Sequence, residues 1–364
     1  MKKVLFILML FISFVYFSSC ELLYPSGYYD KLVNAGEGTN IKREWRLIGN
    51  ANFASYSTCM DLKFGSSGIP YIATIEYDSP ALYIFDGSAW NMNINSTHTN
   101  VSVIAMVISI NTPYIFDNYF DGTSNGYVSY YSGAWYSPYN PVNSNSIVNL
   151  SIDFSSSGFP VVAYSVAVLQ DIHSAEWNGS LWQDFFHTNT NNVSKTTVNR
   201  LEDNVAITWF IDYGVYLKCT NSVTNIFIAP AYILPTYPVN SYDTASRGSI
   251  LYIACGVSNT VEVYTYSILT SYQLLSPVLF DPSNSQINGV SIAVDNYGKP
   301  HVAFSDNLSL VYAFVYDGLS WHMIGETAVD SGFYPVIAIN PVNNVPYVAY
   351  ATNTLTLITV KAFK

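Results

Sequence analysis

Charged residues are scarce in this chain. They make up 11% of its 364 residues, well below the roughly 25% of an average soluble domain. Acidic residues outnumber basic ones by 25 to 14, which gives a formal net charge of −11. The sequence therefore lacks the basic footprint of a nucleic-acid-binding protein, and acidic phospholipid headgroups are equally poor partners. Asn, Ser, Thr and 31 tyrosines take the place of charge, as in many extracytoplasmic β proteins.

The chain also lacks familiar signatures of catalysis. It contains no His-Glu-x-x-His zinc motif and no glycine loop that would bind phosphate in front of a helix. The five histidines show no pair at the spacing of metal ligands. We therefore expect no metal, no cofactor and no catalysis. The alternative is a glycan-active hydrolase or lyase whose carboxylates are dispersed along the chain and meet only in the fold.

Cysteine is rare as well. Of the four cysteines, Cys20 belongs to the N-terminal segment considered below, which leaves Cys59, Cys219 and Cys255. An odd number excludes a framework of disulfides. Cys219 and Cys255 fall in neighbouring units of the repeat described next. We expect buried free thiols there, and a disulfide between these two is the alternative.

One seven-residue motif, Gly-x-Pro-h-(Val/Ile)-Ala-(Tyr/Phe) with h apolar or aromatic, recurs along the chain. Its clearest copies are Gly158–Tyr164 and Gly298–Phe304, and weaker copies are Gly68–Thr74 and Asn344–Tyr350. Copies anchored on the proline, or on the residue that replaces it, lie 43 to 49 residues apart and 46 on average. The anchors are Pro70, Pro113, Pro160, Val205, Leu251, Pro300 and Pro346. A fixed period of this size indicates a repeat architecture.

A second motif follows the first within the period, and it predicts the local structure. It is a short turn with Gly after Asp, Asn or Ser, and it ends in Trp90, Trp135, Trp182 or Trp321. Such turns join antiparallel strands, because Gly and Asn tolerate positive φ. The Gly-x-Pro motif is a second hairpin corner, with Pro at the start of a strand. Short runs rich in Val, Ile, Tyr, Phe and Thr lie between, so each period holds about four strands, as in a β-propeller blade.

The two ends of the repeat region predict how the ring closes. The last repeat stops after its third strand, and Trp45–Gly49 is an isolated segment that matches a fourth strand. We expect this segment to complete the last blade, which removes two exposed sheet edges. The 322 residues from Arg43 to Lys364 equal seven periods of 46. The sequence thus predicts an all-β, seven-bladed β-propeller over residues 44–364; a pair of β-sandwiches and an open solenoid are the alternatives.

Residues 1–19 are predicted to be a targeting segment. Lys2 and Lys3 precede the apolar stretch Val4–Phe17, which is shorter than a typical membrane span. The residues Phe17-Ser-Ser-Cys20 resemble the lipobox of bacterial lipoproteins, whose cysteine is diacylated and becomes the mature N-terminus. An ordinary secretory signal that happens to contain a cysteine is the alternative.

This resemblance implies where the protein acts. The chain is similar to bacterial lipid-anchored β-propeller repeat proteins, with lipid attached at Cys20 and an irregular tether over residues 20–43. A lipid anchor attaches a protein to a membrane without any transmembrane helix. The resemblance therefore implies a protein of the bacterial cell envelope, anchored in the membrane by lipid on its extracytoplasmic side.

Charged residues on the predicted inner strands are one candidate binding site. Asp61, Lys63 and Asp153 stand out because the other repeats place Ser, Ala or Val nearby. A charged cluster at the mouth of a propeller channel would bind a ligand or an ion. The alternative is a local ion pair between Asp61 and Lys63, which lie two residues apart on one strand face.

Aromatic residues of one repeat are the other candidate. Tyr130, Tyr131, Trp135 and Tyr136 cluster within a short stretch. Tyrosine is favoured in recognition because it offers an apolar face and a hydroxyl at a modest entropic cost. The repeated tryptophans at the hairpin corners are more consistent with packing between neighbouring blades.

The leading hypothesis from the sequence is a binding or scaffold protein with a protein or glycan partner. A structural subunit of a cell-envelope assembly is a further alternative. That alternative predicts a large exposed apolar patch on one face or rim of the propeller.

Overall fold

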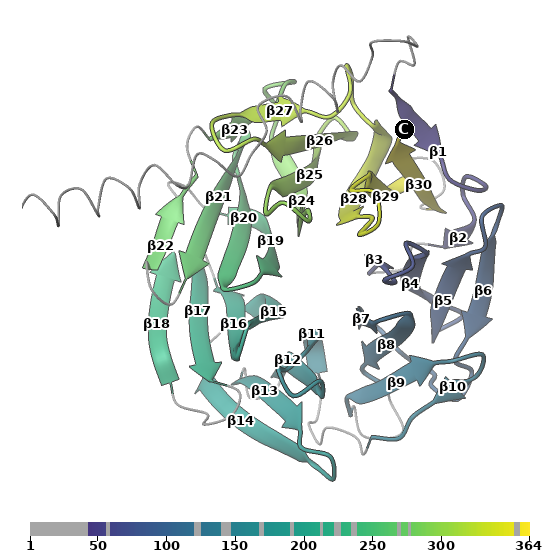
Figure 1. Cartoon of the computed structure of the whole chain (residues 1–364), viewed down its shortest axis with the longest axis vertical. Helices are drawn as coiled ribbons and strands as arrows, with labels where there is room; N and C mark the ends of the chain where they lie inside the picture. The colour runs from purple at the N-terminus through teal and green to yellow at the C-terminus, as the bar shows by residue number, and fades with distance from the viewer. Residues whose placement is uncertain are drawn as a thin grey trace, which may run out of the picture. The chain divides into compact units, whose positions relative to one another are not determined.

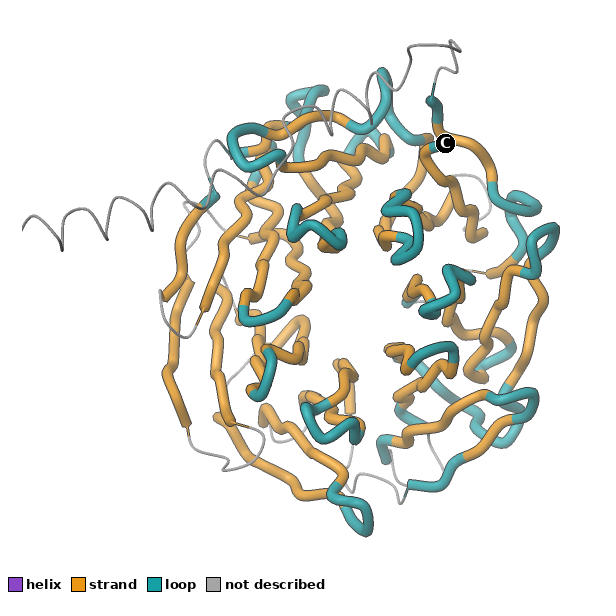
Figure 2. Tube along the Cα trace, viewed as in Figure 1, coloured by secondary structure: helices purple, strands orange, loops and turns teal. Residues whose placement is uncertain are grey.

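The computed structural model of the chain describes residues 43–364, except for the segments listed at the end of this paragraph. The predicted targeting segment, Cys20 and the tether lie outside the described residues. Residues Trp45–Lys364 form one unit, and antiparallel strands arranged around a central opening build it (Figures 1 and 2). In these ranges there is no helix long and apolar enough to cross a membrane. The omitted segments are 56–58, 120–124, 140–146, 167–170, 190–192, 212–213, 222–226, 234–238, 268–270, 276–277 and 353–356.

The innermost strands of the ring contact one another in cyclic order, from β3 through to β28 and back to β3. Figure 1 shows them around the central opening. Residues of each of these strands line the opening. They are β3 (Asp61–Phe64), β7 (Ile104–Ser109), β11 (Ile147–Phe154), β15 (Val193–Leu201), β19 (Val239–Arg247), β24 (Ile287–Val294) and β28 (Asp330–Ile339).

The second strand of each group is the most buried. All residues of β4, β12 and β25 are buried, because both faces of these strands pack against neighbouring sheets. This explains why the Gly-x-Pro motif continues as an apolar run without alternation. The second strands are β4 (Pro70–Glu76), β8 (Thr112–Asp117), β12 (Pro160–Val166), β16 (Asn204–Ile211), β20 (Ile250–Val257), β25 (Pro300–Asp306) and β29 (Pro346–Thr352).

The repeat anchors fall at the start of these second strands, including the anchors that are not proline. Val205 and Leu251 are each the second residue of their strand, so the two degenerate copies belong to the repeat. The corner before the strand is left-handed as predicted. Gly158 has φ +77°, and Asn344, which replaces the glycine in the last copy, has φ +56°.

The third strand of each group pairs with the second on one side and with the outer strand on the other. The third strands are β5 (Ser79–Phe85), β9 (Tyr127–Tyr131), β13 (Asp171–Trp177), β17 (Gly214–Asn221), β21 (Thr260–Ser267), β26 (Leu310–Tyr316) and β30 (Leu357–Phe363). Four outer strands begin at a motif tryptophan. The outer strands are β6 (Trp90–Ile94), β10 (Trp135–Tyr136), β14 (Trp182–Asn189), β18 (Phe227–Ile233), β22 (Ser271–Leu274), β27 (Trp321–Met323) and β1 (Trp45–Leu47).

The predicted closure is confirmed. Strand β1 pairs antiparallel with β30, and Trp45 lies opposite Phe363. Two short strands add to the edges, since β2 (Ala54–Ser55) pairs with β30 and β23 (Leu279–Phe280) pairs with β21. Strand β26 also pairs with β28, which joins the last two groups into one nine-stranded sheet. The all-β architecture with four-stranded groups is confirmed, and the number of seven blades stays a prediction from the repeat count.

The hydrophobic core is divided into layers between neighbouring groups. One layer joins Ala73 and Leu82 of the β3–β6 group to Met106 and Ile115 of the β7–β10 group. Burying a side chain such as Leu82 contributes about 1.5 to 3 kcal/mol relative to leaving it exposed. Each layer therefore fixes one group of strands against the next, which holds the inner strands in place around the channel.

The cysteines of the described region agree with the expectation of buried thiols. Cys219 and Cys255 are buried in the same apolar layer, together with Leu217 and Ile253. Both are free thiols, and no disulfide joins them.

Candidate functional site

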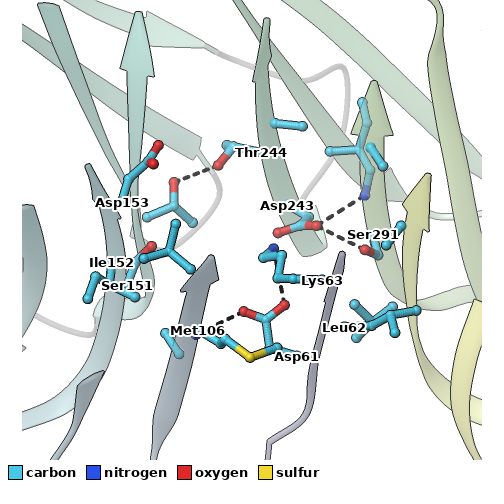
Figure 3. Close-up of a pocket in the computed structure, with 18 of the residues that line it drawn as sticks. Asp61, Leu62, Lys63, Met106, Ser151, Ile152, Asp153, Asp243, Thr244 and Ser291 are labelled. Carbon is cyan, nitrogen blue, oxygen red and sulfur yellow. Dashed lines mark hydrogen bonds and ion pairs between the residues drawn. The ribbon is translucent and has the colours of Figure 1, made fainter. Parts of the chain in front are cut away.

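The central channel contains a cavity of about 690 Å³ that the inner strands line. Figure 3 shows charged and hydroxyl side chains that project into it from these strands. Asp61 and Asp153, which the sequence singled out, both line this cavity, and so does Lys63.

Asp61 forms the local ion pair that the sequence offered as an alternative. Its Oδ1 lies 3.1 Å from Nζ of Lys63, two residues further along β3. Its Oδ2 accepts a 3.0 Å hydrogen bond from the backbone N–H of Met106 on the neighbouring inner strand. Both carboxylate oxygens of Asp61 are therefore engaged within the protein.

The contact between Asp61 and Met106 belongs to a repeated arrangement. A side-chain oxygen of one inner strand accepts the backbone N–H of a residue on the next, between 45 and 49 positions further along the chain. This separation is one repeat, so the same bond recurs around the ring. The other pairs are Ser151 with Val198 (3.1 Å), Asp153 with Arg200 (2.7 Å), Asp243 with Ile292 (3.1 Å) and Ser291 with Ile337 (3.2 Å).

Asp243 is a channel residue that the sequence reasoning missed. Its Oδ1 lies 2.9 Å from Nζ of Lys195, and its Oδ2 accepts hydrogen bonds from Ser291 Oγ and from the Ile292 N–H. The spacing of the aspartates in the sequence could have indicated Asp243. Asp61, Asp153 and Asp243 follow one another at 92 and 90 residues, which is twice the repeat.

The carboxylates and ammonium groups of the cavity influence one another. Burial disfavours the charged form of Lys63, but the negative charges of Asp61 and Asp243 outweigh it and raise the pKa of Lys63. Lys63 therefore stays protonated at neutral pH, and Figure 3 shows it extending toward Asp243. The channel thus holds the charged ammonium group of Lys63 near three carboxylates, with a second ammonium group, that of Lys195, against Asp243.

The pKa values of two channel carboxylates, Asp153 and Asp243, shift in opposite directions. Burial raises the pKa of Asp153, although the backbone N–H groups of Arg200 and Phe154 favour its charged form. Burial also opposes charge on Asp243, but Lys195 outweighs it, and the pKa of Asp243 is lowered. The difference arises because Asp243 has an ammonium group at 2.9 Å.

The predicted aromatic cluster lies away from the channel, on the third and outer strands of its group. In the register of β9 and β10, Trp135 is opposite Tyr131 and Tyr136 is opposite Tyr130. Tyr130 and Tyr136 stack with ring centroids 5.2 Å apart and an angle of 17° between planes. Tyr136 is 47% exposed, so the stack offers a flat aromatic surface to solvent.

The other two members of the cluster, Tyr131 and Trp135, pack against each other and are less exposed than Tyr136. Tyr131 packs edge-on against Trp135, with centroids 5.5 Å apart, and its hydroxyl donates a 2.7 Å hydrogen bond to Oδ1 of Asn93. Asn93 belongs to β6 of the preceding group. The neighbouring Tyr139 packs against Trp177 instead, and burial raises its pKa to about 12. The exposed part of the predicted cluster is therefore centred on Tyr130 and Tyr136.

Histidine–carboxylate pairs are a feature that the spacing of the histidines did not indicate. His98 Nδ1 lies 2.9 Å from Asp117 Oδ2 in a buried pair, and burial raises the pKa of Asp117. His173 Nδ1 lies 3.0 Å from Asp184 Oδ2. Within the described ranges, no group of three His, Cys, Asp or Glu side chains is arranged to hold a metal ion.

Comparisons with known proteins identify the architecture. No protein-family model and no curated protein matches the chain, whereas solved structures do. The propeller domain of Cps50 (Swd1) from Myceliophteria thermophila is 12% identical with a TM-score of 0.59, and the match covers 88% of this chain and 100% of that one. BBS1N, crystallised in complex with ARL6DN, is 13% identical with a TM-score of 0.57, covering 89% and 98%. The fold is a β-propeller.

A bacterial propeller structure matches over a similar length. The extracellular domain of the one-component system BT4673 from B. thetaiotaomicron is 14% identical with a TM-score of 0.52. The match covers 87% of this chain, which spans only 39% of that protein's chain. At these identities the β-propeller fold is what the proteins share.

Proposed function

We propose that this β-propeller is a lipid-anchored protein of a bacterial cell envelope that binds a protein or glycan on the extracytoplasmic side. The lipobox-like residues Phe17-Ser-Ser-Cys20 and the low charge of the chain support the location. The fold supports a binding role, since the propeller BBS1N was crystallised with a protein partner. The lipid attachment site in this proposal is Cys20.

The exposed stack of Tyr136 on Tyr130 is the observation that carries the binding role. Tyr136 keeps 47% of its surface exposed although it stacks on Tyr130 and lies on an outer strand. Tyr131 and Trp135 lie on the same two strands and pack against each other. Rigid aromatic side chains of this kind bind planar sugar faces and protein side chains at little entropic cost.

Binding is tested by capture with the intact protein. Wild type and Tyr136→Ser are used to capture partners from the native envelope and are applied to a glycan array. We expect Tyr136→Ser to weaken binding about tenfold or more, because truncating a tyrosine at the centre of an interface, where hot spots cluster, costs about 2 kcal/mol or more. Tyr334→Ser is the matched control, since Tyr334 is 55% exposed and lies on a different group of strands. Equal loss in both variants, or no loss in either, contradicts a site at Tyr136.

The channel gives no support to the dispersed hydrolase. That alternative requires carboxylates free to act on a substrate at one mouth of the channel. Asp61, Asp153 and Asp243 instead accept backbone N–H groups of the next inner strand. Their geometry assigns them to holding the ring together.

One observation favours the second candidate, a structural subunit of an envelope assembly. Large apolar side chains are exposed at the edges of the ring, such as Ile110 and Val342 at one edge (75% and 65%) and Tyr77 at the other (83%). Exposed apolar patches mark interaction surfaces.

Attachment at Cys20 is tested by metabolic labelling with a palmitate analogue. Wild type is expected to incorporate label and Cys20→Ser to lose it. Equal labelling of both chains ends the proposal of a lipid at this position.

A further inference from the structure

Three tyrosines form a column of rings across the sheet of β7 to β10. Tyr114 lies opposite Tyr130 in the register of β8 and β9, and Tyr130 lies opposite Tyr136 of β10. Their successive ring centroids are 5.4 Å and 5.2 Å apart, with angles of 36° and 17° between planes. These distances are close to the spacing of neighbouring strands, so the rings follow one another from strand to strand. The column ends at the edge of the sheet, where Tyr136 is 47% exposed.

The other groups of strands do not repeat this column. In the β3–β6 group the equivalent row is Tyr71, Ile84 and Asn91. The remaining rows of the described strands are Val161, Glu176 and Gln183; Ala206, Cys219 and Ala229; Tyr252, Thr265 and Gln273; His301, Val315 and His322; and Tyr347, Ala362 and Arg46. The fold therefore does not require three aromatic residues in this row, and the β7–β10 group departs from the repeat at an exposed edge.

The inner end of the column is fixed by the next group of strands. Tyr114 packs edge-on against Phe154 of β11, with ring centroids 5.0 Å apart and an angle of 89° between planes. Both side chains are partly buried. A ligand ring that stacks on the outer face of Tyr136 thus meets a surface that is already ordered, and little conformational entropy is lost on binding.

The β7–β10 group carries almost no charge. The sequence contains no Lys or Arg between Lys63 and Lys195. Over residues 87–152 its only Asp, Glu, Lys or Arg residues are Asp117 and Asp121. Asp117 is fully buried, and Asp121 lies outside the described residues. The described surface of this group therefore offers no charged partner to an anionic or a cationic ligand, whereas a neutral ligand needs none.

The sheet edge beside the column is poorly suited to a peptide. Strand β10 consists of Trp135 and Tyr136, and Pro138, two residues later, has no backbone N–H. A peptide that adds to a sheet edge needs a longer run of main-chain partners. The exposed residues that flank the ring, 132–134 and Ser137, are small or polar, whereas the core of a protein interface is rich in large apolar and aromatic side chains. These features favour a ligand that stacks on one ring and bonds to hydroxyl groups.

We propose that the outer face of Tyr136 binds a neutral glycan, with one pyranose ring placed as the next member of the column. This inference rests on the proposed binding role of Tyr136 and names the class of its ligand. A pyranose has an apolar C–H face that packs on an aromatic ring, and hydroxyl groups around its rim. Ser132 and Ser137 supply exposed hydroxyls on either side of the Trp135–Tyr136 strand.

Binding to defined glycans tests this assignment. The intact protein is applied to an array of neutral and acidic glycans, and the neutral glycan that binds best is titrated by calorimetry. We expect Tyr136→Ser to weaken this binding about tenfold or more, because the stacked ring is lost. Tyr136→Phe keeps the ring and is expected to keep most of the affinity. Tyr334→Ser is the matched control, since Tyr334 is 55% exposed on another group of strands, and it is expected to bind as wild type does.

Two further measurements report on how the glycan is held. The affinity is expected to be the same in about 50 mM and about 500 mM sodium chloride, because no ion pair contributes to it. Saturation transfer difference NMR is expected to mark the protons on one face of a sugar ring. This pattern is expected with wild type and with Tyr136→Phe, and is expected to be lost with Tyr136→Ser.

The neutral-glycan assignment and the proposed binding role fail in different ways. Preferred binding of acidic glycans, or an affinity that falls steeply with salt, overturns the assignment. Capture of a protein through Tyr136 by a chain that binds no neutral glycan also overturns it, and leaves the binding role standing. A neutral glycan whose binding Tyr136→Ser and Tyr334→Ser weaken equally is bound elsewhere, which contradicts both. A chain that binds neither glycan nor protein contradicts both as well.

Discussion

The indole Nε1 of Trp45 donates a 2.8 Å hydrogen bond to the backbone carbonyl of Ile324, although 279 positions separate them in the sequence. Trp90 makes the equivalent bond to the carbonyl of Ile48 at 2.9 Å. In each case the tryptophan that begins an outer strand binds the residue just after the outer strand of the preceding group. Trp45 and Trp90 thus link neighbouring groups, and at Trp45 the link helps to close the ring.

Replacing Trp45 tests what this closing bond contributes. We expect Trp45→Phe to lower the free energy of unfolding by about 0.5 to 1.5 kcal/mol, the usual net value of one hydrogen bond. Trp135→Phe is the matched control, because the buried Nε1 of Trp135 has no hydrogen-bond partner. Removing that donor is expected to leave stability unchanged or to raise it. Urea unfolding of both variants gives the comparison, and an equal loss in both is evidence against a role for the Trp45 bond.

Among the channel carboxylates, replacement of Asp243 is expected to lower the free energy of unfolding most. Asp243→Ala leaves Lys195 without its carboxylate partner, although the Tyr242 carbonyl still accepts from it, and leaves the N–H of Ile292 without its acceptor. Hydrogen bonds to charged groups contribute about 1.5 to 3 kcal/mol each in favourable cases, and partial exposure reduces this. We expect a loss of about 2 kcal/mol in the free energy of unfolding for Ala. Asp243→Asn, which keeps the shape and an acceptor, is expected to lose less; thermal and urea unfolding measure both.

The pH dependence of stability separates Asp243 from Asp153. The pKa of Asp243 is lowered in the folded state, so its contribution is present above the ordinary Asp value and is lost as pH falls through the folded pKa. Burial raises the pKa of Asp153, so its ionisation opposes folding as pH rises above the ordinary value. On acidification from pH 6 to pH 3, Asp243→Asn is therefore expected to lose less stability than wild type, and Asp153→Asn to lose more. Urea titrations at a series of pH values measure these slopes, and parallel curves for the two variants contradict the assignment.

The buried cysteines predict a clear pattern of reactivity. Burial raises the pKa of the Cys219 thiol to about 11 and also raises that of Cys255. Because the thiolate is the reactive species, neither is expected to react with Ellman's reagent in the native protein. Both react once urea unfolds the chain. If neither position yields a thiol in unfolded, unreduced protein, the two are joined by a disulfide after all.

Much of the fold follows from the sequence because the repeat acts locally. A Gly or Asn that adopts positive φ and a Pro that opens a strand set the corner, and these occur at Gly158 and Asn344 as predicted. The unpaired segment at Trp45 indicated the closing strand for a similar reason, since the last repeat lacked one. These features depend on residue type and spacing alone, which the sequence displays directly.

The candidate site was harder to predict because it depends on contacts one repeat apart. The pairing of Asp61 with Lys63 was accessible, since both lie on one strand. The hydrogen bond from Met106 to Asp61 and the contact between Asp243 and Lys195 connect different groups of strands. Whether such side chains meet depends on the rotation of one sheet against the next and on rotamers. Neither the rotation between sheets nor the rotamers can be deduced from the hydrophobic pattern of the sequence.

The pairing of β1 with β30 has a consequence for how the protein is made. Trp45 leaves the ribosome more than 300 residues before its partner Phe363, a delay of about 15 to 60 s at ordinary rates of bacterial or eukaryotic synthesis. During that time the first strand has no sheet to join, and the first and last groups keep open edges that attract other chains. Assembly of the ring is therefore a late event, and a chain that loses its final strand is expected to be recognised as unfinished by proteases and chaperones.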